Sequence, residues 1–272
     1  MNQRDFKISI ITISYNSEKF ITDTIQSVTS QTYSNIEYII IDGGSVDGTI
    51  DIIKKFESKI SKWISEPDKG IADAFNKGCN FSTGEYILIL NSDDALSNCN
   101  VVEKMVAEIY LNNLPKLIYG NYDIFKREKA ELLYHGKVEF DPSKLKQGLV
   151  LPQPTLFVHQ SYFKKYGNFD ISFKIAMDYE WLLRGIMKET VVHVPWVVTN
   201  IRDGGISTVN QKKVINEIIR ALKKNNFFPN LFSEFKTISY FYLRYFSKKT
   251  LEKMGLYKIF FTLRTRLKKC II

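Results

Sequence analysis

The sequence has too few cysteines and histidines for a disulfide-stapled or zinc-binding protein. Three of each occur among its 272 residues. The cysteines, Cys79, Cys99 and Cys270, are odd in number and show no metal-ligand spacing, which argues against a disulfide framework and fits a reducing compartment. The histidines are scattered along the chain, which argues against a zinc site.

The amino-terminal region lacks a long hydrophobic run. The first apolar stretch, Ile8 to Ile13, is too short for a signal peptide or a membrane span. We therefore expect a cytoplasmic protein. No internal repeat or low-complexity segment is present.

Positive charge is scarce in the body of the chain and concentrated in its tail. The net charge is +9, but residues 206–272 hold 15 Lys and Arg against three Asp and Glu. The remaining residues hold 23 basic and 26 acidic side chains, a balance of −3. This asymmetry predicts a domain at 1–205 and a separate tail at 206–272.

Short apolar runs rich in β-forming residues alternate with amphipathic segments in the first third of the chain. Strands are predicted at Lys7–Ser14, Ile36–Ile41, Trp63–Ser65 and Tyr86–Leu90. Helices are predicted between them, with Ser17 capping the first, then at Ile50–Glu57 and Ile71–Asn80. This alternation predicts an α/β fold with a largely parallel, doubly wound sheet.

The pattern becomes mixed after Leu96. Helices are predicted at Val101–Leu111, Ser161–Tyr166 and Asp178–Met187. Strands are predicted at Lys116–Phe125 and Ala130–His135, as a pair, and at Gln153–His159 and Val191–Val198.

Polar loops follow three of the predicted parallel strands, at Tyr15-Asn16, Asp42–Asp47 and Asn91–Asp94. Ligands of such sheets bind beyond the carboxyl ends of the strands, so we expect these loops to gather at one edge. Asp93 and Asp94 repel each other unless a divalent cation lies between them and a polyanionic ligand. A polar turn accounts for the same residues taken alone.

Several motifs, in order, resemble family 2 glycosyltransferases. They are Thr12–Asn16, Gln31–Tyr33, Ile41–Thr49, Trp63–Gly78 and the carboxylate motif Asn91–Asp94. The resemblance covers residues 7–207 and implies a GT-A fold, with a nucleotide-sugar half at 1–97 and an acceptor half at 98–205. It also implies inverting transfer from a nucleotide-diphosphate sugar, UDP-linked, with Mn²⁺ or Mg²⁺ as the cofactor.

The resemblance assigns roles residue by residue. Asp93 and Asp94 are the metal ligands, and the metal bridges the two phosphates. Many members have a carboxylate where this chain has Asn91, which retains a hydrogen bond to ribose but removes one charge. The implied donor-binding residues are Tyr15, Asn16, Asp42, Asp68, Lys69, Asn91 and Asp93.

Inverting transfer requires a base that takes the proton of the attacking hydroxyl. In the family this base is an acid at the start of a late helix, a position that Asp178 matches. Glu180 is the rival, but residues two apart on a helix point to different faces, so only one can act. Taken alone, Asp178 is also an acid that complements a helix dipole.

Two further segments leave alternatives open. Arg202–Ser207 resembles the family's Gly-Gly-x-Ser segment, which closes on the donor phosphates, but it also suits a linker. His159 is typical of a packed strand-end residue, with a functional role as the alternative.

The tail from Phe227 to Ile272 mixes aromatic and basic residues. Leu256, Ile259, Phe260, Leu263 and Leu267 follow helical spacing. We predict an amphipathic anchor on an anionic membrane surface, with helices packed on the catalytic domain as the alternative. No nucleic-acid-binding motif accompanies the charge, so no nucleic acid partner is expected.

The sequence therefore predicts a metal-dependent inverting glycosyltransferase of the hexosyltransferase type. The expected acceptor is a hydroxyl of a glycan or a polyprenyl-lipid-linked glycan, in surface or capsular polysaccharide synthesis. The expected location is the inner face of the cell membrane, as a peripheral protein. A nucleotidyltransferase and a membrane-docked, non-catalytic scaffold are the alternatives.

Overall fold

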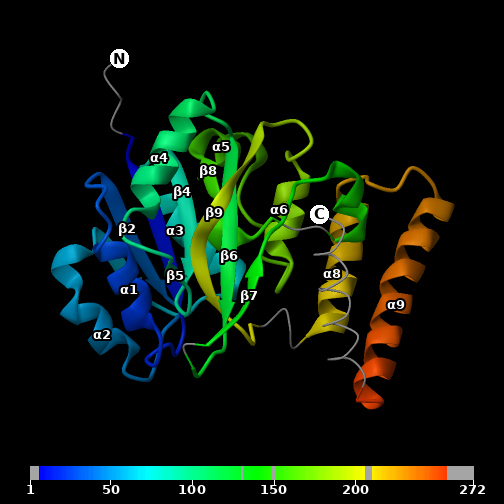
Figure 1. Cartoon of the computed structure of the whole chain (residues 1–272), viewed down its shortest axis with the longest axis horizontal. Helices are drawn as coiled ribbons and strands as arrows, with labels where there is room; N and C mark the ends of the chain where they lie inside the picture. Colours follow the sequence, from blue (N-terminus) through cyan, green and yellow to red (C-terminus); the bar gives the residue numbers. More distant parts are fainter. Residues whose placement is uncertain (1–5, 130, 149–150, 206–209, 256–272) are drawn as a thin grey trace.

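One mixed β-sheet with helices on both faces forms the centre of the molecule (Figure 1). The computed structural model describes residues 6–129, 131–148, 151–205 and 210–255. The strands run in the order β3-β2-β1-β4-β8-β6-β9-β5, and β7 pairs with β6. This is the α/β architecture that the sequence predicts, a doubly wound mixed sheet built from two halves.

The amino-terminal half supplies the parallel strands. Its elements are β1 (Ile8–Ser14), α1 (Ile21–Thr29), β2 (Ile36–Asp42), α2 (Thr49–Lys55), η1 (Glu57–Lys59), β3 (Lys62–Ser65), α3 (Ile71–Phe81) and β4 (Tyr86–Asn91). Ser14 lies beside Asp42, and Ile13 beside Asn91. The carboxyl ends of β1, β2 and β4 therefore meet at one edge of the sheet, as predicted.

The second half mixes strand directions. Its elements are β5 (Ala95–Leu96), α4 (Val101–Leu111), β6 (Leu117–Phe125), β7 (Leu132–Gly136), η2 (Pro142–Gln147), η3 (Gln153–Thr155), β8 (Phe157–His159), α5 (Gln160–Tyr166), α6 (Met177–Leu183) and β9 (Val191–Arg202). The short strand β8 is antiparallel to both β4 and β6 and joins the two halves. β6 and β7 form the expected antiparallel pair.

Three predicted elements have bounds that differ clearly from those in the structure. Residues Gln153–Thr155 form a 3₁₀ turn instead of a strand, because Pro152 and Pro154 have no N–H to donate to a ladder. The helix at Asp178 begins one residue earlier, at Met177, and ends at Leu183, four residues before the predicted end. The last strand continues to Arg202, because it pairs with β6 as far as Phe125.

Ser17 does not cap the first helix, which begins only at Ile21. Its hydroxyl lies 2.7 Å from the Ser92 hydroxyl instead, and its backbone N–H donates to Thr49 Oγ1. Ser17 therefore links the loop after β1 to the loop after β4.

Alternate residues of the parallel strands fill two hydrophobic cores, one on each face of the sheet. Ile11, Ile39 and Ile89 face α3, α5 and α6, whereas Ile10, Ile40 and Leu88 face α1 and α4. Such burial on both faces explains the nearly continuous apolar runs in the sequence.

The predicted tail includes α8 (Gln211–Lys224) and α9 (Leu231–Lys253); in Figure 1, α8 lies beside α6, and α9 lies on the far side of α8. α8 buries Glu217, Ile218, Ala221 and Leu222, so it packs on the domain that carries α6. α9 buries only Thr237 and Phe241. The predicted stripe from Leu256 to Leu267 lies outside the described residues. Among those residues, no helix combines the length and apolar character that crossing a membrane requires.

Candidate active site

A cleft of about 1300 Å³ opens at the carboxyl ends of the parallel strands. Loops of the first half form one wall, and the β6–β7 hairpin, Leu151–Pro154 and α6 form the other. Seven of the predicted residues line it: Tyr15, Asn16, Asp68, Asn91, Asp93, Asp94 and Asp178. Asp42 and Lys69 are not among the residues that line this cleft.

The loops after β1 and β2 are held together by Asn16. Its backbone has φ 48°, a left-handed conformation that Asn tolerates better than most residues. Its side-chain Oδ1 accepts from Val46 N at 3.0 Å, and its own N–H donates to Ser45 Oγ at 2.8 Å. This pairing presents Tyr15, 63% exposed, at the cleft.

Asp42 is fully buried and accepts five hydrogen bonds within the protein. Oδ1 accepts from the hydroxyls of Ser14 and Ser45, and Oδ2 accepts from the Ser65 hydroxyl and the backbone N–H groups of Gly44 and Ser45. Asp42 thus fixes the turn beneath the cleft. Its direct contact with a nucleobase stays a prediction.

Gly43 allows Asp68 and Tyr15 to converge. A Cβ at Gly43 would lie 2.5 Å from Asp68 Oδ2 and 3.4 Å from Tyr15 Cδ2. Asp68 Oδ1 accepts from the Gly70 N–H at 2.8 Å, which leaves Oδ2 at this meeting point. The Lys69 side chain is exposed, and its backbone carbonyl accepts from Lys174 Nζ at 2.9 Å.

The carboxylate motif lies where β4 ends. Asp94 is 1% exposed, and Asn91 Nδ2 donates to its Oδ2 at 2.9 Å. Burial, together with the charge of Asp93, raises the pKa of Asp94 to about 8, whereas the Asn91 hydrogen bond lowers it. The Asn91 amide therefore donates a hydrogen bond to Asp94. A third acid at position 91 would repel Asp93 and Asp94 instead.

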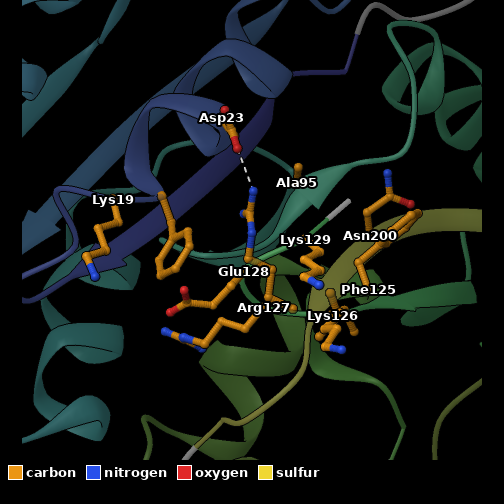
Figure 2. A pocket seen from close by; sticks show the side chains of 12 residues that line it. Lys19, Asp23, Ala95, Phe125, Lys126, Arg127, Glu128, Lys129 and Asn200 are labelled. Atoms are coloured by element: carbon orange, nitrogen blue, oxygen red, sulfur yellow. Dashed lines mark hydrogen bonds and ion pairs between the residues drawn. The ribbon is translucent and has the colours of Figure 1, made fainter. Parts of the chain in front are cut away.

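Two arginines surround Asp93. Arg127 Nη1 donates to Asp93 Oδ2 at 2.9 Å, and Arg202 Nη1 donates to the Asp93 carbonyl at 2.9 Å. Both guanidinium groups lie over the Phe20 ring, 4.8 and 4.9 Å from its centroid. Arg202 also pairs with Asp23, as the dashed line in Figure 2 shows.

The residues drawn in Figure 2 line a second hollow of about 480 Å³ that adjoins the cleft. The two share Lys19, Phe20, Arg127, Ile201 and Arg202. The sequence placed Arg202 in a motif but gave no signal for Arg127. Arg127 reaches Asp93 because the β6–β7 turn places its guanidinium group over the Phe20 ring, just before α1.

The residues at Asp93 fit a divalent cation in part. Carboxylate oxygens suit Mg²⁺ and Mn²⁺, and Mg²⁺ often uses one or two carboxylates together with substrate phosphates. The described residues contain no group of three or more His, Cys, Asp or Glu arranged to hold a metal. Asp93 and Asp94 would therefore supply two ligands, and Arg127 would have to release Asp93 Oδ2.

Asp178 lines the cleft from the first turn of α6. Its Oδ1 accepts from the Tyr179 N–H at 2.8 Å. Burial raises the pKa of Asp178 to about 6, backbone hydrogen bonds oppose the rise, and the charge of Glu217 adds to it. A carboxyl with this pKa is ionised at neutral pH yet remains a stronger base than an ordinary aspartate.

Glu180 lies away from the cleft, fully buried. It pairs with Arg184 and, at 3.0 Å, with Lys224 of α8. Burial raises the pKa of Glu180, but the hydrogen bonds from Arg184 and Lys224 outweigh this and lower it. Its geometry is that of a structural ion pair.

The wall opposite the loops after β1, β2 and β4 includes three hairpin residues that the sequence did not single out. Tyr122, Leu133 and Tyr134 come from the β6–β7 hairpin. Gln153 also lines this wall, and its Nε2 donates to the Ile89 carbonyl at 2.7 Å.

His159 is not among the residues that line the cleft. It faces Tyr86, with ring centroids 5.1 Å apart, and accepts from the Ser161 N–H, as a packed strand-end residue does.

The fold and this cleft define a GT-A glycosyltransferase that uses nucleotide-sugar donors. Residues 9–167 match the family model described as glycosyl transferase family 2. The chain belongs to this family.

Relatives and solved structures agree with this assignment. An uncharacterized glycosyltransferase of Mycobacterium tuberculosis is 30% identical over 76% of this chain and 79% of its own length. The Escherichia coli protein WfgD, a UDP-Glc:α-D-GlcNAc-diphosphoundecaprenol β-1,3-glucosyltransferase, is 36% identical over 44% of this chain and 47% of its own length.

Two solved structures share the fold at low identity. TarS of S. aureus, in complex with UDP, superposes with a TM-score of 0.65 and 18% identity over 89% of this chain and 72% of its own. The mannosyltransferase PcManGT of Pyrobaculum calidifontis, with GDP-Man and Mn²⁺, gives a TM-score of 0.63 and 12% identity over 98% of this chain and 81% of its own.

Proposed function

We propose that this glycosyltransferase moves a sugar, with inversion, from a UDP-linked donor to a hydroxyl of a lipid-linked glycan. One observation carries the proposal: a single cleft holds Asp93 and Asp94 on the nucleotide side and Asp178 on the opposite wall. The diphosphoundecaprenol acceptor named for WfgD and the UDP bound to TarS support the choice of acceptor and donor.

The nucleotide is held by the first half of the chain. Tyr15 offers an exposed ring for stacking, and Asp68 Oδ2 is available beside it for a ribose or base hydrogen bond. Asp42 acts by fixing the turn that brings Gly43 and Ser45 under the donor. Asp93 and Asp94 would hold Mn²⁺ or Mg²⁺, which neutralises the charge that develops on the departing diphosphate.

Asp178 is the proposed general base. The acceptor oxygen bonds to the anomeric carbon from the face opposite the diphosphate, as the bond from that carbon to the diphosphate oxygen breaks. The hydroxyl proton passes to Asp178, and the bonding electron pair leaves with the nucleoside diphosphate. Glu180 is the weaker candidate, because Arg184 and Lys224 occupy its oxygens.

Product analysis tests the proposal. A panel of nucleotide sugars is incubated with Mn²⁺ or with chelator, and the released phosphate compounds are identified. We expect nucleoside diphosphate, released only with metal. Pyrophosphate release would overturn the proposal in favour of a nucleotidyltransferase, and no release from any donor would favour the scaffold.

Asp93→Ala tests the metal assignment within the same assay. We expect it to abolish metal-dependent donor binding, because the substitution removes Asp93, the less buried of the two carboxylates. Asp51→Ala, on the exposed surface of α2 and outside the cleft lining, is the matched control and is expected to keep binding within about twofold. Metal-dependent binding retained by Asp93→Ala would overturn the assignment.

We further propose that the enzyme works at the surface of a membrane, where its acceptor lipid lies. α9 supports this setting. Phe232, Phe235, Leu243 and Phe246 are 59–76% exposed, and their spacing places them on one face of the helix. Phe241, on the opposite face, is buried against the body, so the apolar face points outward.

A further inference from the structure

Glu217, in the middle of α8, is a buried acid with an unusual set of partners. Its side chain is 7% exposed. Its carboxylate accepts from three consecutive backbone N–H groups, those of Lys174, Ile175 and Ala176, at distances between 2.8 and 3.1 Å. The described residues record no ion pair for it, so these amides are what offsets the cost of burying its charge.

The three amides lie directly before the proposed base. Ala176 is the N-cap residue of α6, and Asp178 is the second residue of that helix. The N–H groups of an N-cap residue and of the residues before it have no partner within the helix and must find one outside. Glu217 provides that partner, so the chain from Lys174 to Asp178 cannot shift without breaking its hydrogen bonds.

The same segment also contacts the nucleotide loop. Lys174 Nζ donates to the Lys69 carbonyl at 2.9 Å, beside Asp68 and Gly70. A Cβ at Gly70 would lie 3.8 Å from Lys174 Nζ. Glu217 therefore holds a segment that carries the base at one end and touches the donor loop at the other.

We propose that Glu217 is a positioning residue for sugar transfer, and that α8 belongs to the catalytic machinery although it lies in the predicted tail. This inference rests on the proposed role of Asp178. It assigns α8 a task beyond covering apolar surface: it fixes the distance between base and donor. A misplacement of about 1 Å can cost about 100-fold in rate, so a small slackening of this segment is measurable.

The surroundings of Asp178 make the pH profile an informative readout. α8 contributes Glu217, whose charge raises the pKa of Asp178. Away from the cleft, Glu180 of α6 pairs with Arg184 and with Lys224 of α8. The remaining residues that line the small hollow under Asp178 are uncharged: Ile87, Ile89, Gln153, Leu156, Val158, Phe163, Phe169, Trp181 and Leu182.

The test compares Glu217→Gln with the matched control Glu234→Gln. Glu234 pairs with Lys223 and has no contact with the 174–176 segment among the described hydrogen bonds and ion pairs. For Glu217→Gln we expect kcat to fall about tenfold or more with donor KM within about twofold, because the base shifts while the donor site stays. The acid limb of the kcat profile is expected to move to lower pH, since the neighbouring charge is gone.

Glu217→Asp keeps the charge on a shorter side chain, and it decides the case if Glu217→Gln does not fold. We expect kcat to fall with the acid limb close to its original pH. Full kcat in either folded variant, or equal losses in Glu217→Gln and Glu234→Gln, would overturn the inference.

Asp178→Asn separates this inference from the proposed function. If Asp178→Asn keeps turnover, the proposed base is wrong and the inference falls with it. If Asp178→Asn loses turnover while Glu217→Gln keeps it, only the positioning role of Glu217 is wrong.

Discussion

At the scale of single residues, Asn91 explains how two adjacent carboxylates persist at the end of a buried strand. Its amide donates to Asp94 and lowers the pKa that burial and Asp93 raise. A carboxylate at this position would face Asp94 Oδ2 at hydrogen-bond distance, and above the raised pKa of Asp94, about 8, the pair would have no proton to share. The amide therefore stabilises the motif when no cation is bound.

Asn91→Asp tests this account. Without metal and above pH 8, where Asp94 is ionised, we expect the variant to lose about 1–3 kcal/mol of stability, because a hydrogen bond becomes a contact between like charges. With Mn²⁺, the additional charge is expected to recover most of that loss. Thermal melts with chelator and with Mn²⁺ measure both effects, and Asn80→Asp on exposed α3 surface is the control. Equal melting temperatures for Asn91→Asp and wild type in chelator would contradict the account.

Asp178 sets an expected pH dependence. A base must be deprotonated to act, so kcat is expected to fall as the pH drops through about 6. An unperturbed aspartate would keep its rate down to about pH 4. Asp178→Asn should bind donor normally and lose about 100-fold or more in kcat. A kcat profile flat from pH 7 to pH 5 would contradict this assignment.

The same raised pKa has a consequence for stability. A carboxyl whose pKa is higher in the folded protein than in the unfolded chain stabilises the fold in its protonated form, and this contribution is lost as the pH rises through about 6. Asp178→Asn removes the buried charge, so its melting temperature at pH 7.5 is expected to equal or exceed that of wild type. Stability lost in this variant would indicate that the carboxylate has a structural role.

Sequence reasoning reached the donor side of the site because its residues directly follow strands. Tyr15, Asn91 and Asp93 lie where parallel strands end. Such ends can be located in the sequence, because an apolar run stops there and turn-forming polar residues follow. Arg127 could not be predicted, because it contacts Asp93 from a hairpin turn that lies 34 residues further along the chain. Glu217 was missed for the same reason, because its partners are backbone amides more than 40 residues away.

At the scale of elements, the strands with a clear local sequence pattern were predicted correctly. The strand ends that depend on pairing with distant strands were not. β1, β2 and β4 are buried on both faces and read as apolar runs, so the parallel half followed from the sequence. The full length of β9 did not, because its last residues are half-exposed and are ordered by pairing with β6. Proline at positions 152 and 154 signalled the 3₁₀ turn, but the apolar residues that follow outweighed it in the prediction.

The contact between α3 and the sheet depends on Gly78. A Cβ there would lie 2.3 Å from Ile11 Cγ2, so Gly78→Ala must push α3 away from β1. Alanine gains about 1 kcal/mol of helix propensity, but overpacking costs about 1–3 kcal/mol. We expect a net loss of stability and a melting temperature lower by several degrees. Gly205→Ala is the control, because a Cβ added at Gly205 would have no atom within 4 Å. If Gly78→Ala is as stable as wild type, α3 moves freely.

At the scale of the whole molecule, α8 joins the exposed apolar face of α9 to the catalytic domain. Gly148, at the end of η2, lies where Phe241 of α9 and Ile218 of α8 meet. Ile218 is the neighbour of Glu217 in α8. The outward face of α9 is thus attached to the body through the same helix that holds the proposed base.

The exposed face of α9 makes a prediction for the whole protein. Phe232 and Phe235 lie on this face, the exposed Lys236 follows Phe235 directly, and the exposed Lys249 lies about one turn beyond Phe246. Burying each phenylalanine in the interface contributes about 1.5–3 kcal/mol, and the cations add attraction to anionic lipids that salt weakens. Vesicles containing anionic phospholipid are therefore expected to bind the protein, and neutral vesicles to bind it weakly.

Co-sedimentation with these vesicles measures the binding. Phe232→Ser with Phe235→Ser is expected to weaken binding to anionic vesicles by more than tenfold, while donor hydrolysis in solution stays unchanged, because neither residue lines the cleft. Leu111→Ser is the matched control, since Leu111 is equally exposed at the end of α4. If the double variant binds as wild type does, α9 is not the docking surface. If neutral vesicles bind as tightly as anionic ones, the basic charge of the tail has another purpose.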